Sequence, residues 1–198
     1  MKAANSLKKI FVSSTRRKLI QILFQDPQEM YYVRQLVRMS KEEINSVRRE
    51  LDNLKQADLI RSEVRGNRLY YSVNQNSEIF PELVSLSSKM SLLARSILDK
   101  KNLIGKIKWV LGSPQFIAHL PPTTPSQVDL IIIGQISLKE IASIIKQEEE
   151  RQAREINYMV MDKSELKLRK TKRDPFIVDF FLNCPQIIIG NALELSAI

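Results

Sequence analysis

The sequence predicts a two-domain chain of the mixed α+β and α/β classes, on three observations. Its 198 residues suffice for two domains of about 100 residues each. Apolar residues recur at helical spacing over residues 15–54, and the spacing changes to alternation after Ala57-Asp58. From about residue 104, strand-like apolar runs alternate with helical segments, as in α/β domains. We expect domains over residues 1–77 and 102–198, joined by a linking helix over residues 78–101.

Composition narrows the class of protein. The chain is 43% hydrophobic and 27% charged, which is typical of a soluble globular protein and excludes collagen and wholesale disorder. No apolar run approaches the roughly 18 to 20 residues that a membrane span requires, so we expect no membrane partner and a cytoplasmic location. A single Cys184 and a single His119 exclude an intrachain disulfide and a Cys-based or His-paired metal site. We expect no metal and no cofactor.

The positive charge of the chain is concentrated in its first third. The formal net charge is +9, and residues 1–75 hold 15 Lys and Arg against 8 Asp and Glu. This excess indicates a polyanionic partner for the N-terminal part. The alternative is a basic face that is only solvated, and charge alone does not decide between the two.

Three helices are expected before the change of period. The first, over residues 15–24, has its apolar residues on one stripe and ends before Asp26-Pro27. A second, shorter helix covers residues 34–37. Ser40 and Glu43 have the spacing of a capping box, so a third helix should start there. Its apolar residues follow at steps of three, four and three along one face: Ile44, Val47, Leu51 and Leu54.

A β-hairpin is expected after the third helix. Residues 59–64 and 68–73 have the alternation of strands, and Arg65-Gly66-Asn67 between them tolerates a tight turn. Three helices followed by a basic hairpin is the element order of a winged helix-turn-helix domain.

Residues 12–73 resemble the ArsR-like winged helix-turn-helix transcription regulators. Residues 46–60 are similar to the family's recognition helix as it enters the first wing strand, and residues 66–73 to the returning strand. Where the family usually has Gly, this chain has Asp58, which can adopt the left-handed conformation required there.

The resemblance implies binding to double-stranded DNA. The third helix would lie in the major groove and the wing would reach phosphates or the adjacent minor groove. The alternative is an ordinary exposed helix face, which carries the same residue types. The residues so placed are Lys41, Asn45, Ser46, Arg48, Arg49, Arg65, Asn67 and Arg68.

A long helix is expected over residues 79–99. Its apolar residues follow a heptad spacing, which predicts either a seam between two subunits of a homodimer or a face that seats the helix on its own domain. These residues are Ile79, Leu83, Leu86, Met90, Leu93 and Ile97.

The second half of the chain predicts an α/β domain. Strands are expected at residues 107–111, 128–133, 156–161 and 187–189, and helices at residues 138–154, 163–170 and 175–182.

The order of these elements resembles the minimal nucleotidyltransferase fold of the polymerase beta superfamily. In that family a Gly-Ser pair after the first strand cradles the triphosphate, and three carboxylates hold Mg²⁺. This chain has Gly112 and Ser113, and it keeps Asp129, but Gln127 and Asn157 stand where the other two acids belong. Two amides and one carboxylate are a poor set for Mg²⁺. We therefore expect a vestigial nucleotide site at these five positions, with no catalytic residue. For Gly112-Ser113-Pro114 we favour a helix N-cap, with Pro at the first helical position, over a working phosphate site.

The sequence thus favours a DNA-binding transcription regulator with an inactive nucleotidyltransferase-like C-terminal domain. That pseudoenzyme domain would bind a protein or nucleotide ligand or support the dimer. The alternatives are an active Mg-dependent nucleotidyltransferase and an antitoxin-like interaction protein, each using the winged domain for docking.

Overall fold

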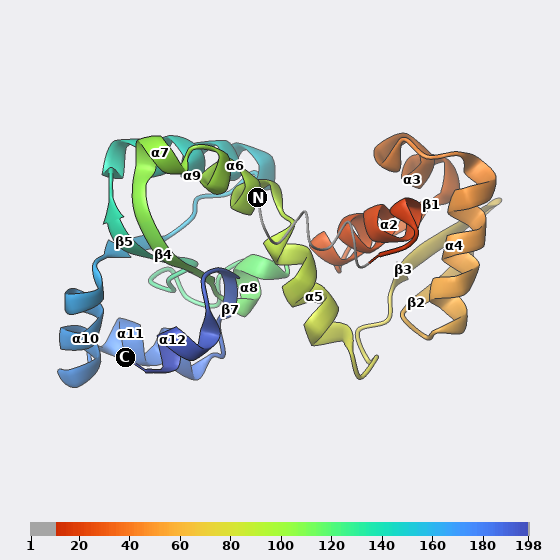
Figure 1. The fold of residues 1–198 in the computed structure, drawn as a ribbon. Helices are drawn as coiled ribbons and strands as arrows, with labels where there is room; N and C mark the ends of the chain where they lie inside the picture. Colours follow the sequence, from red (N-terminus) through yellow and green to blue (C-terminus); the bar gives the residue numbers. More distant parts are fainter. Residues whose placement is uncertain (1–10, 198) are drawn as a thin grey trace. The chain divides into compact units, whose positions relative to one another are not determined.

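The computed structural model describes residues 11–197, which divide into two compact units, residues 11–90 and 91–197. Each unit is built around its own β-sheet, with three strands in the first and four in the second (Figure 1). The chain is therefore a mixed α and β protein with two sheets. Within residues 11–197, no helix combines the length and the apolar character needed to cross a membrane.

The N-terminal unit follows the predicted order of elements, with one addition. The predicted hairpin forms, and β1, which the sequence did not indicate, joins it because Tyr31 and Tyr32 pair antiparallel with Tyr71 and Tyr70. The sheet order is β1-β3-β2. The elements are α2 (Ser14–Gln25), β1 (Tyr31–Tyr32), α3 (Val33–Ser40), α4 (Ile44–Gln56), β2 (Ile60–Arg65), β3 (Arg68–Val73) and α5 (Phe80–Lys89).

The predicted capping box at the start of α4 is wrong. Ser40 is the last residue of α3, where its hydroxyl donates to the carbonyl oxygen of Val37. The N-cap is Glu43, whose carboxylate accepts from the amides of Asn45 and Ser46 at 2.7 and 3.2 Å. Because the carboxylate is ionised, it satisfies these free amides and also complements the positive end of the helix dipole.

The core of this unit is formed by the predicted apolar faces. α2 lies against α3, α4 and α5. Gln21 links α2 to the last turn of α5, because its amide donates to the carbonyl oxygen of Met90 and its own carbonyl accepts from the Ser87 hydroxyl. The buried apolar residues of the first three helices are Leu19, Ile20, Leu23, Phe24, Leu36, Val47, Leu51 and Leu54.

The single helix predicted over residues 79–99 is two helices. α5 ends at Lys89, and α6 (Leu92–Asp99) begins after Ser91, whose hydroxyl caps it by accepting from the amide of Ala94 at 3.2 Å. A serine hydroxyl competes with a continuous helix by satisfying the first free amides of a new one. The linker predicted over residues 78–101 is thus replaced by a unit boundary between Met90 and Ser91.

The apolar stripe of residues 79–99 is fully buried only in its second half, because Ile79 is half-exposed and Leu83 and Leu86 are half-buried. Met90, Leu93 and Ile97 are at most 5% exposed. Leu93 and Ile97 therefore seat α6 within its own unit, as one of the two alternatives for this stripe predicts.

The C-terminal unit contains every strand and helix predicted for it, with bounds shifted by a few residues. After α6 its elements are α7 (Lys101–Ile104), β4 (Gly105–Gly112), α8 (Pro114–Ile117), β5 (Leu130–Ile136), α9 (Leu138–Gln152), β6 (Tyr158–Met161), α10 (Lys163–Thr171), α11 (Pro175–Leu182), β7 (Gln186–Ile189) and α12 (Ala192–Ser196).

The four-stranded sheet of this unit is mixed. Its order is β6-β5-β4-β7, with β5 and β6 parallel and joined by α9, and the other pairs antiparallel. α10, α11 and α12 pack on one face of this sheet and complete its main core. Its buried residues are Trp109, Leu111, Ile131, Ile133, Met161, Leu166, Ile177, Phe180 and Leu195.

Candidate functional site

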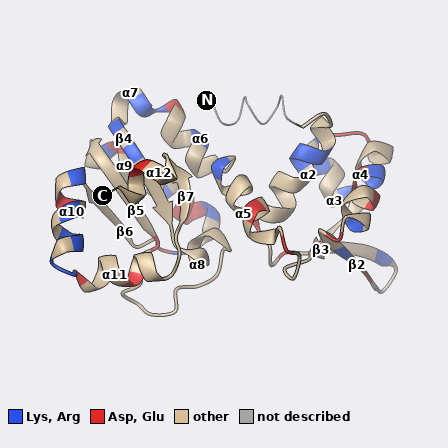
Figure 2. Cartoon of the chain, turned by 60° about the horizontal axis from the view of Figure 1, so that its bottom comes forward, with Lys and Arg blue, Asp and Glu red and all other residues tan. Residues whose placement is uncertain are grey.

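The outward face of α4 is basic and polar. Asn45, Arg48 and Arg49 are exposed, whereas Glu50 is only 4% exposed and lies on the inward side. The Lys and Arg positions along α4 and the adjoining hairpin are blue in Figure 2. Along α4 the exposed cations Arg48, Arg49 and Lys55 therefore outnumber the one exposed acid, Asp52, because the helix directs Glu50 into the unit.

Two glutamates near this face are held by cations of α2. Glu50 accepts from Nε of Arg16 at 2.8 Å and from the amide of Asn53 at 3.3 Å. Glu42, just before α4, pairs with Nζ of Lys18 at 2.6 Å and accepts from the Thr15 hydroxyl. These contacts neutralise both acids and orient α4 on α2.

Both carboxyl groups have a lowered pKa. The hydrogen bond from Lys18 is the main cause for Glu42, whose pKa lies below its usual range. Burial of Glu50 favours its neutral form, but the hydrogen bonds from Ser13, Arg16 and Asn53 outweigh burial and leave the pKa lowered. Both acids are therefore ionised at neutral pH.

The β2–β3 hairpin, which follows α4, carries further cations at its tip. Gly66, at the first central position of the two-residue turn, has φ +59°, in the left-handed region that favours glycine, and this fits a type II′ turn. Arg68 lies over the ring of Tyr32, with its guanidinium carbon 5.1 Å from the ring centroid. Arg65 instead pairs with Glu63 at 3.2 Å, and both side chains are more than half exposed.

The structure brings the predicted binding residues into two groups. Asn45, Ser46, Arg48 and Arg49 share α4, with Ser46 half-buried and the other three exposed. Lys41 is exposed in the turn between α3 and α4, in the left-handed conformation. The hairpin tip carries Arg65, Asn67 and Arg68, all exposed.

A second polar cluster forms where β5 begins. Asp129 is fully buried, and its carboxylate accepts from the amide of Asn157 at 3.1 Å. The side-chain amide of Asn157 donates to the carbonyl oxygens of Pro125 and Gln127 at 3.1 and 3.2 Å. The three positions expected to correspond to a carboxylate triad are therefore neighbours.

Arg154 completes this cluster, and sequence reasoning missed it. Its two terminal nitrogens contact the two oxygens of Asp129 at 2.9 and 3.1 Å, in a bidentate pair. Its guanidinium also lies 5.8 Å from the ring centroid of Phe116 in α8. An isolated Asp in an apolar strand indicates that a cation pairs with it in the folded chain. The sequence does not show which cation, because 25 residues separate Asp129 from Arg154 and no spacing rule connects them.

Gly112 and Ser113 are used by the fold. A Cβ at Gly112 would lie 2.8 Å from Cδ1 of Ile117, so apolar side chains fill the space beside it. Ser113 is 2% exposed; its hydroxyl caps α8 by accepting from the amide of Phe116, and its own amide donates to the carbonyl oxygen of Asp129. The N-cap interpretation of Gly112-Ser113-Pro114 is confirmed.

The residues at this cluster do not fit Mg²⁺. Both oxygens of Asp129 are held by Arg154, and Gln127 is tied by its amide group to Gln115 and Thr123. In residues 11–197 no three His, Cys, Asp or Glu side chains lie close enough to hold a metal ion. The cation that a hard metal would supply beside Asp129 is here a guanidinium group.

No family model, curated protein or solved structure matches the chain. The interpretation of both sites therefore depends on their own geometry.

Proposed function

We propose that this chain is a DNA-binding transcription regulator whose residues 11–90 form a winged helix-turn-helix domain. The observation that carries the proposal is the outward face of α4, which is basic while Glu42 and Glu50 are neutralised by α2. A helix with this face, followed directly by a hairpin with exposed arginines, has the charge and order required to enter a groove and contact its walls. Such a regulator would act in the cytoplasm.

The residues of α4 and those of the hairpin would play different parts. Arg49 and Asn45 on α4 have the side chains that pair with guanine and adenine edges, so they would contribute to sequence preference. Arg68, held over Tyr32, would contact a phosphate and contribute to affinity on any sequence. Arg65 would have to leave Glu63 before it could bind.

Binding to duplex DNA by fluorescence anisotropy tests the proposal. Fragments selected from genomic DNA of the source supply the specific site, and a shuffled duplex supplies the comparison. The logarithm of affinity should fall linearly with the logarithm of salt concentration, with a slope of about 0.9 per phosphate contact. R49A should weaken specific binding by about 1 to 3 kcal/mol and leave shuffled DNA nearly unaffected, whereas R68A should weaken both.

A matched control separates this surface from general charge. Arg95 is an exposed helical arginine on α6, so R95A removes the same charge elsewhere and should leave both affinities unchanged. Binding that does not depend on salt, or an R49A and R68A double variant that binds like wild type, would refute the assignment.

We propose further that residues 91–197 form a nucleotidyltransferase-like domain that transfers no nucleotide. The bidentate Arg154–Asp129 pair supports this, because it occupies the carboxylate that a metal would need. Incubation with labelled nucleoside triphosphates, Mg²⁺ or Mn²⁺ and cell extract should yield no labelled product. Robust transfer by the wild-type chain that is lost in D129A would overturn this part.

We also propose that the regulator acts as a homodimer. One recognition helix contacts too few bases to select a site in a genome, so readers of this kind pair two half-sites. Because Met90, Leu93 and Ile97 are buried within one chain, the proposed dimer requires an interface other than the full stripe of residues 79–99.

A further inference from the structure

α11 is apolar on nearly every side and yet lies at the surface. In its sequence, Pro-Phe-Ile-Val-Asp-Phe-Phe-Leu, Asp179 is the one charged residue. Ile177 and Phe180 face the core, but Phe176 is 50% exposed, Val178 38% and Leu182 76%. A helix of this composition is normally covered on all sides, so the outer side of α11 indicates a contact surface.

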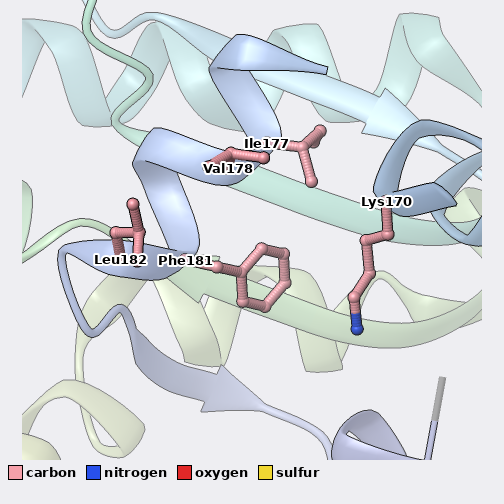
Figure 3. A pocket seen from close by; sticks show the side chains of 5 residues that line it. All are labelled: Lys170, Ile177, Val178, Phe181 and Leu182. Carbon is pink, nitrogen blue, oxygen red and sulfur yellow. The ribbon is translucent and has the colours of Figure 1, made fainter. Parts of the chain in front are cut away.

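A pocket opens between this outer side and α10. It has a volume of about 280 Å³ and is lined by Lys170, Ile177, Val178, Phe181 and Leu182. In Figure 3 the side chain of Lys170 lies beside the ring of Phe181, with Ile177 above them. The ammonium nitrogen of Lys170 lies 5.5 Å from the ring centroid of Phe181. The pocket therefore has apolar walls and one cation.

The charge around this pocket favours an anion. Residues 163–182 contain six Lys and Arg against three Asp and Glu. Arg169 alone pairs with both Glu165 and Asp174, so two of these acids are already neutralised. Lys170 forms no ion pair within the described part of the chain. A carboxylate entering the pocket would meet an uncommitted ammonium group.

We propose that this pocket binds a small organic anion with an apolar body, such as a medium-chain or aryl carboxylate. The carboxylate pairs with Lys170, and the apolar body lies against Phe181 and Ile177. Apolar walls with one well-placed polar group are the usual composition of small-ligand sites, and the volume corresponds to a ligand at the lower end of that range. An ion pair beside an apolar wall is better shielded from water than one at an open surface. The proposal stands independently of DNA binding.

Methyl NMR of the full-length chain tests the site, with octanoate as the probe and octanol as its uncharged counterpart. Titration with octanoate should shift the methyl resonances of Ile177, Val178 and Leu182 and yield a saturable affinity. Octanol should shift the same methyl groups but bind about fivefold more weakly, because a partly exposed ion pair contributes about 1 kcal/mol at most.

Three variants identify the contacts. K170M keeps the aliphatic stem and removes the charge, so octanoate should lose its advantage over octanol. K139M removes an exposed lysine of α9 and should change neither affinity. V178E adds a carboxylate at the partly exposed rim, without loss of core packing, and should abolish octanoate binding by repulsion.

Several results would overturn the proposal. One is equal affinity of the wild-type chain for octanoate and octanol. Another is octanoate binding unchanged in K170M, or methyl shifts confined to other residues. A sedimentation result in which L182S converts a dimer to a monomer would assign the outer side of α11 to a second copy of the chain instead.

Discussion

Replacing Arg154 by Met should strongly destabilise the C-terminal unit, because its guanidinium group is the ion-pair partner of a buried carboxylate. Asp129 is fully buried, and two of the three hydrogen bonds that its carboxylate accepts come from Arg154. R154M keeps most of the aliphatic stem but leaves a buried carboxylate with only the amide of Asn157. Removing one partner of a buried ion pair costs about 3 to 5 kcal/mol.

Trp109 allows the loss of stability in R154M to be measured for the C-terminal unit alone. It is the chain's single tryptophan and is 1% exposed in the C-terminal core, so its fluorescence reports the unfolding of that unit. With a urea dependence of about 2 kcal/mol per molar, the midpoint should fall by about 2 M in R154M.

A double variant, D129N with R154M, is the decisive comparison. It removes both charges and keeps an amide at residue 129, so it should recover more than half of the lost stability. If R154M shifts the midpoint by less than about 0.5 M, or if the double variant is as unstable as R154M, the ion pair does not hold this cluster together.

Three further outcomes follow from the same structure. The ionised form of Glu50 stabilises the N-terminal unit, because folding lowers the pKa of this carboxyl group. The free energy of unfolding should therefore fall as the pH drops through the acidic range. E50Q should flatten this pH dependence, as measured by tyrosine circular dichroism. G134A should destabilise the four-stranded sheet by several kcal/mol in urea titrations followed by Trp109 fluorescence, because its Cβ would lie 2.2 Å from the backbone oxygen of Lys106; wild-type stability would contradict that packing. Sedimentation at micromolar concentration should show a dimer that persists in I79K, because this half-exposed residue is the end of a stripe that is otherwise mostly covered; a wild-type monomer would refute the dimer.

Periodicity alone predicted most elements of both units. The apolar steps over residues 15–54 and the alternation after Asp58 place α2, α3, α4 and the hairpin, because each pattern must bury one face of a helix or a strand. Asp58 takes the left-handed conformation expected of it, with φ +55°. Local patterns failed where two local solutions compete: Glu43 rather than Ser40 caps α4, and Ser91 divides the predicted long helix.

By itself, the sequence determined the positions of the strands, the basic character of the first third and the presence of amides at Gln127 and Asn157. Only the tertiary structure decided which charges remain available. Arg16 and Lys18 neutralise the acids near α4, and Arg154 forms an ion pair with Asp129. Arg169 pairs with the two acids beside Lys170. The spacing of apolar residues indicates the local conformation of one helix or strand, whereas an ion pair depends on which distant elements pack together. Burial then determines how strongly the two charges interact.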